Sequence, residues 1–89
     1  MELSQEYSNF LKSVYNEAIK SAEAIHRLYG DKTSKIYPSY YYIVNDISYD
    51  LEKKHNIPQP VAYEMLRDMN TALALEEIAL YGKKNEPTD

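Results

Sequence analysis

The sequence predicts an all-α protein, an up-down-up bundle of three helices at about residues 4–29, 38–55 and 59–81. Two observations predict this class. Apolar residues recur at spacings of three to four along the first and third segments, which is the period of a helix with one buried face. Glycines and prolines fall between the segments, where helices end or begin. Short links favour antiparallel neighbours, which gives the up-down-up order.

The first segment has the clearest helical pattern. Ser4 is suited to the N-cap, and Gly30 stands where a glycine commonly follows the last turn of a helix. His26 and Arg27 place basic side chains at the negative end of the helix dipole. The opposite face is polar throughout. The apolar face consists of Tyr7, Leu11, Val14, Ala18, Ala22, Ile25 and Tyr29.

The second segment contains three consecutive tyrosines within "YPSYYYIVNDISYDL". Its β-branched and aromatic residues also fit a hairpin that turns at Asn45 and Asp46. Asn-Asp is a weak turn signal, and a lone two-stranded hairpin is marginally stable. We therefore expect a helix with a buried stripe. The stripe consists of Tyr40, Ile43, Val44, Ile47 and Leu51.

The third segment starts at the prolines of "NIPQP" and ends at Gly82. On one continuous helix, Leu75 and Ile78 point away from the core, so the helix is apolar nearly all round. This pattern predicts burial on more than one side. A second copy or a partner bound at Leu75 and Ile78, cover by the loop at 32–37, and a wrong assignment of the core face all remain open. The assigned core face is Ala62, Met65, Leu66, Met69, Ala72, Leu73 and Leu80.

The second helix carries more aromatic side chains than its buried stripe can use. Tyr42, Asp46 and Tyr49 share its outer face, and Tyr41 lies at the flank. Such tyrosines either pack their rings along the surface of the bundle or form a contact patch, since tyrosine is enriched at protein interfaces. Asp46 and Asp50 would favour a basic partner.

Two polar residues are expected within the apolar surroundings of the helix ends. Glu76 falls in the assigned apolar face, and His26 lies near the same end of the bundle. A buried carboxylate must find donors or take up a proton. Glu76 is therefore predicted to form a structural hydrogen bond to a tyrosine hydroxyl or to His26, to line a pH-sensitive or ligand-binding polar pocket, or to lie at a solvated helix end.

Composition narrows the function classes. The net charge of −4 and the presence of only two arginines disfavour nucleic-acid binding, and two glycines leave no phosphate-binding loop. The chain has no cysteine and no catalytic motif, so we expect no enzyme activity, cofactor or metal site. No apolar run is long enough for a membrane span. We expect a cytoplasmic protein with a single domain at residues 1–82 and a disordered polar tail at 83–89.

The expected function is to bind another protein and to inhibit or neutralise it, as immunity proteins, antitoxins and phage-encoded inhibitors do. Small size, acidity and surplus tyrosine and leucine favour this class. The size and helical build resemble those of small bacteriocin immunity proteins, which usually have a fourth helix that this pattern does not show. The alternative is a self-associating regulatory protein, with Leu75 and Ile78 in the dimer contact.

Overall fold

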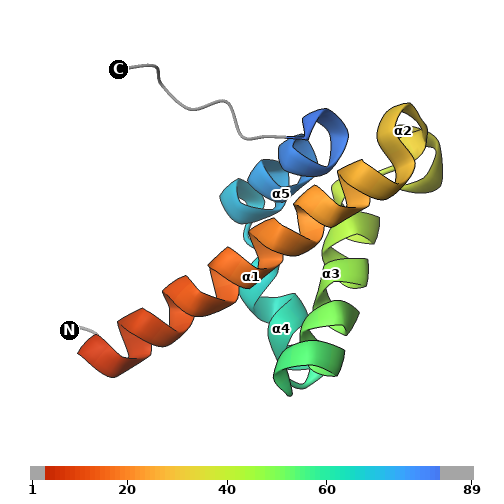
Figure 1. Ribbon diagram of the computed structural model, residues 1–89. Coiled ribbons are helices and arrows are strands. Elements are labelled where there is room, and N and C mark those ends of the chain that lie inside the picture. Colours follow the sequence, from red (N-terminus) through yellow and green to blue (C-terminus); the bar gives the residue numbers. More distant parts are fainter. Residues whose placement is uncertain (1–3, 83–89) are drawn as a thin grey trace, which may run out of the picture.

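The computed structural model describes residues 4–82, and its regular structure over these residues is entirely helical (Figure 1). The all-α class is therefore confirmed, and the hairpin alternative for the tyrosine-rich segment is wrong. The predicted tail at 83–89 lies outside the described residues. The elements are α1 (Gln5–Tyr29), a 3₁₀ turn η1 (Gly30–Lys32), α2 (Thr33–Ile36), α3 (Tyr40–His55), α4 (Gln59–Leu66) and α5 (Met69–Tyr81).

The core lies where α1, α3 and α5 meet. α5 packs against both α1 and α3, α1 also crosses α3, and α4 packs mainly against α3. Ala18 and Ala22 are completely buried on α1, and such small side chains let neighbouring helices approach closely. The larger side chains that fill the core are Ile43, Val44, Ile47, Leu51, Leu66, Leu75 and Ile78.

α1 begins and ends as its sequence predicts. The Ser4 hydroxyl accepts a hydrogen bond from the Tyr7 N–H at 3.1 Å, and Gly30 follows the last turn with a φ of 51°. The first buried side chain of α1 is Val14, so the first turns extend past the other helices, as Figure 1 shows. Tyr7 and Phe10 on these turns are about half exposed.

The predicted third helix is broken in two, so the structure has four main helices instead of a three-helix up-down-up bundle. α4 ends before Arg67, and the backbone of Asp68 is extended, with φ −53° and ψ 136°. The Asp68 carboxylate then accepts a hydrogen bond from the Thr71 N–H at 3.4 Å, which caps α5. An aspartate at this position starts a new helix instead of continuing the old one.

The break changes which side of the segment is buried. Leu75 and Ile78 are 0% and 1% exposed, whereas Met69 and Leu73 are 55% and 43% exposed. The prediction that Leu75 and Ile78 bind a partner or a second copy is therefore wrong, because both side chains fill the core. η1 and α2 also pack against α5, so the chain itself covers this helix on more than one side.

The link between α3 and α4 is fixed by polar contacts. Asn56 adopts a left-handed conformation with a φ of 56°, which asparagine tolerates better than most residues. The Glu52 carboxylate accepts a hydrogen bond from the Gln59 N–H at 3.0 Å, and the Gln59 side-chain amide donates to the Ser48 hydroxyl at 2.9 Å. These bonds hold the start of α4 against the last turns of α3.

Candidate partner-binding surface

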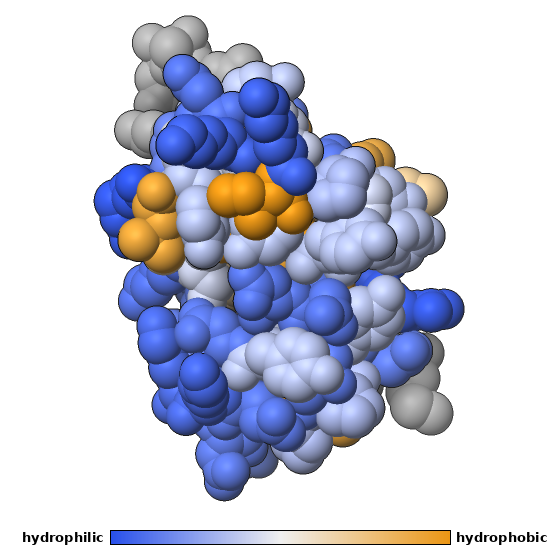
Figure 2. All heavy atoms as spheres, turned by 90° about the vertical axis from the view of Figure 1, so that its right-hand side faces the viewer, coloured by the Kyte–Doolittle hydropathy of each residue, from blue (hydrophilic) through white to orange (hydrophobic). Residues whose placement is uncertain are grey.

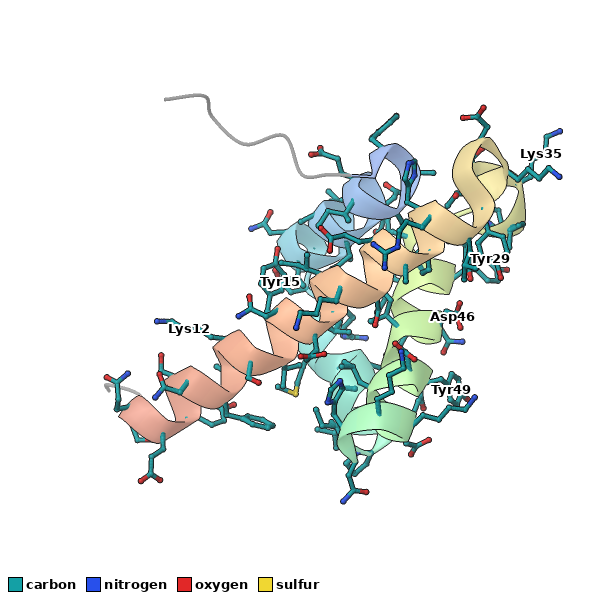
Figure 3. The ribbon with its side chains drawn as sticks, in the orientation of Figure 1. Lys12, Tyr15, Tyr29, Lys35, Asp46 and Tyr49 are labelled. Atoms are coloured by element: carbon teal, nitrogen blue, oxygen red, sulfur yellow. The ribbon has the colours of Figure 1, made fainter. Side chains whose placement is uncertain are left out.

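The outer side of α3 carries the aromatic residues that the helical spacing placed there. Its inner side is buried through Ile43, Val44, Ile47, Ser48 and Leu51. Tyr41, Tyr42 and Tyr49 are 51%, 58% and 51% exposed, and Asp46 is also exposed. Figure 3 shows Asp46 and Tyr49 on the same side of α3. We call the set Tyr41, Tyr42, Asp46 and Tyr49 the α3 face.

The three consecutive tyrosines have three different environments. Tyr40 is half-buried against the core, and its hydroxyl lies 3.4 Å from the sulfur of Met69. The Tyr41 ring lies beside that of Tyr40, with 4.4 Å between centroids. Tyr42 points outward and, with Tyr41, Asn45 and Tyr63, lines a shallow hollow between α3 and α4. Tyr63 thus extends the aromatic surface onto α4, which the sequence reasoning did not identify.

A cleft adjoins the α3 face, between α3 and the second half of α1. Its volume is about 200 Å³, which is smaller than the roughly 300–1,000 Å³ of most small-molecule sites. The buried Ile25 and Ile47 form an apolar floor, and the rim combines an exposed leucine with aromatic, acidic and basic groups. The side chains at its rim are Leu28, Tyr29, Tyr37, Asp46, Asp50 and Lys54.

Asp46 is oriented by a tyrosine from the loop before α3. The Tyr37 hydroxyl donates a hydrogen bond to the Asp46 Oδ2, and the ring of Tyr29 meets that of Tyr37 edge-on, with 5.9 Å between centroids. Burial, and secondarily the Asp46 carboxylate, raise the pKa of Tyr37 well above its ordinary value. The hydroxyl therefore stays protonated and keeps donating to Asp46 at neutral pH.

Asp50 braces α1 against α3 in addition to bordering the cleft. The Ser21 hydroxyl donates to its Oδ2 at 2.5 Å, and the Lys54 ammonium lies 3.4 Å from its Oδ1. A second contact between the same helices joins His55 Nε2 to the Glu17 carboxylate at 2.9 Å. The half-buried Asp50 is thus less available to a partner than Asp46.

The two polar residues expected near the helix ends are both half-buried. His26 donates from Nδ1 to the carbonyl of Ala79 at 3.2 Å, which ties the end of α1 to α5. Gly82 lies against the His26 ring, where a Cβ would come within 2.7 Å of it. The pKa of Tyr40 is raised mainly by a hydrogen bond with the Tyr41 hydroxyl. The nearby Glu76 carboxylate makes a smaller contribution in the same direction.

Sequence reasoning missed Tyr29, Tyr37 and Leu28 as surface features. Tyr29 belongs to the apolar stripe of α1 but lies one turn beyond Ile25, the last buried residue of the helix. This position at the helix end was the one sign in the sequence that Tyr29 could be exposed. Leu28 is 75% exposed next to it, off that stripe. The pairing of Tyr37 with Asp46 depends on how the loop returns to α3, which no local spacing encodes.

Figure 2 shows the side of the molecule on the right in Figure 1, where α2 and α3 lie. Strongly hydrophilic side chains mix with weakly hydrophilic ones there, and most of the small hydrophobic area lies in the upper half. Within residues 4–82, no helix is both long and apolar enough to cross a membrane, and no cluster of three His, Asp or Glu side chains is placed to hold a metal ion.

No family model, curated protein or solved structure matches the chain. The likeness to small bacteriocin immunity proteins is therefore one of size and helical build.

Proposed function

We propose that this protein binds another protein through the α3 face and thereby neutralises it, as an immunity protein, antitoxin or phage-type inhibitor does, with the cytoplasm as its compartment. One observation carries the proposal. Tyr41, Tyr42 and Tyr49 each expose about half of their surface on one side of a single helix, around the exposed Asp46.

The rigidity of α3 supports this role. Ile43, Val44 and Ile47 on its inner side are 0–1% exposed, so the helix is anchored in the core along its length. Tyrosine side chains have two rotatable angles and a large ring, so they bury much area at a low entropic cost. A partner that meets a preformed helix does not have to order it, and less binding free energy is lost.

Charge indicates what kind of partner fits. The chain has a net charge of −4, and Asp46 stands in the middle of the α3 face. A basic partner surface would be attracted over a distance and would associate faster at low salt. Occupying that surface is enough to neutralise the partner if the surface contains its active or target-binding site.

Partner capture with matched variants tests the proposal. We expect immobilised wild-type protein to retain a basic protein from an extract of the source cells, and Tyr42→Ala/Tyr49→Ala protein to lose it. Tyr81→Ala is the control, because Tyr81 is 74% exposed but lies at the end of α5. The retained protein, once purified, should lose its activity when the wild type is added.

Two results would contradict the proposal. In one, the double variant retains the same protein as wild type. In the other, the complex forms with unchanged partner activity, which would leave binding in place but remove neutralisation. Circular dichroism of each variant must show unchanged helix content for the comparison to hold.

A further inference from the structure

The cleft between α1 and α3 has the chemistry of a receptor for one basic side chain. Its floor includes Ile25 and Ile47, and Leu28 stands at its rim. An apolar lining of this kind suits the methylene stem of a long cation, which is commonly buried along apolar surface while its charged end stays polar. The rings of Tyr29 and Tyr37 form part of the same wall.

Two carboxylates stand above this floor on successive turns of α3. Asp46 and Asp50 are four residues apart, about 6 Å along the helix axis. Tyr37 occupies one oxygen of Asp46, and Ser21 occupies one oxygen of Asp50. A carboxylate accepts about four hydrogen bonds, so both groups keep acceptor capacity.

A cation from the chain itself already lies at this position. The Lys54 ammonium is 3.4 Å from Oδ1 of Asp50, and its side chain is 66% exposed. An ion pair this exposed is weak, so an incoming cation can displace it. Lys54 thus shows that the cleft mouth accepts a positive charge and also acts as an internal competitor.

We propose that the cleft receives an arginine side chain of the partner, with its guanidinium bridging Asp46 and Asp50 and its stem on the apolar floor. Arginine fits better than lysine because its planar fork can donate to two carboxylates at once and can stack on a tyrosine ring. This inference rests on the proposed function, because Asp46 belongs to both the cleft and the α3 face.

Small probes test the cleft without the partner. N-acetyl-arginine amide is titrated into the protein while amide chemical shifts are recorded, and N-acetyl-citrulline amide, which has nearly the same shape but no charge, is the control. We expect the arginine probe to shift the amides of Tyr37, Asp46 and Asp50 saturably, with citrulline causing little change. Equal shifts from both probes, or none, would overturn the inference.

Variants of the cleft should change binding of the probe in opposite directions. Asp46→Asn keeps an oxygen that can accept from Tyr37, and it should weaken binding of the arginine probe about tenfold or more. Glu64→Gln on α4 removes the same charge and should leave binding of the probe unchanged. Lys54→Gln should strengthen binding about 1.5- to 5-fold by removing the competitor. Weaker binding to Lys54→Gln, or no change with Asp46→Asn, would overturn the proposal.

The two proposals fail separately. If the arginine probe does not bind but Tyr42→Ala/Tyr49→Ala still abolishes capture, only the arginine receptor is wrong. If the probe binds but the tyrosine variants capture the partner normally, only the role of the α3 face is wrong.

Discussion

At the scale of single residues, Tyr37 links three parts of the molecule. Its backbone N–H donates to the Thr33 carbonyl at 2.8 Å, its ring meets Tyr29 at the end of α1, and its hydroxyl donates to Asp46 on α3. One side chain therefore helps to set the width of the cleft and the direction of its most exposed carboxylate.

Because the pKa of Tyr37 is raised by folding, stability should fall at high pH. The unfolded chain ionises near the ordinary tyrosine pKa of 10.0, while the folded chain resists ionisation until the pH exceeds the raised value. The stabilisation is thus fully present below about pH 10 and is lost as the pH rises above it. Denaturant unfolding between about pH 8 and pH 11, a range that brackets the ordinary tyrosine pKa, should show a smaller loss of unfolding free energy for Tyr37→Phe than for wild type. Parallel pH curves would contradict this assignment.

The outward positions of Tyr42, Asp46 and Tyr49 could be predicted from sequence because a helix of known phase fixes which side each residue occupies. Tyr40 was expected in the core and is only half-buried, since it lies at the first turn of α3. The Tyr37–Asp46 bond could not be predicted, because it depends on the path of the chain through η1 and α2.

At the scale of elements, the break between α4 and α5 decides which residues are core. Leu66 and Ala72 are both buried, and their six-residue separation fits no single helical face. Asp68, a favourable N-cap, lies between them. The sequence contained both signals, but the apolar pattern of this segment also supports one continuous helix, so the choice required the tertiary packing of α5 between α1 and α3.

A matched pair of substitutions on α5 tests this register. Leu75→Ala removes a completely buried side chain and should lower the free energy of unfolding by about 2–5 kcal/mol. Leu73→Ala makes the same chemical change at a partly exposed position and should cost less than about 1 kcal/mol. Denaturant unfolding measures both. Equal losses of unfolding free energy, or a larger loss for Leu73→Ala, would contradict this register and favour a single continuous helix over residues 59–81.

At the scale of the whole molecule, the crossing of α1 and α3 organises the surface. The buried alanines of α1 permit the crossing, and the pairs Ser21–Asp50 and Glu17–His55 fix it from outside the core. Figure 3 shows Tyr29, Asp46 and Tyr49 on one side of the molecule and Lys12 and Tyr15 on the other. The fold therefore presents the α3 face and the cleft together, as one continuous surface.

The most direct test is calorimetric titration of the captured partner with single variants. If the α3 face binds the partner, Tyr42→Ala and Tyr49→Ala should each weaken binding by about 1–2 kcal/mol or more. Each 1.4 kcal/mol corresponds to roughly a tenfold increase in Kd. Tyr81→Ala should change it by less than about 0.5 kcal/mol. Wild-type affinity in both α3 variants, or an equal loss in all three, would contradict the binding role of this face.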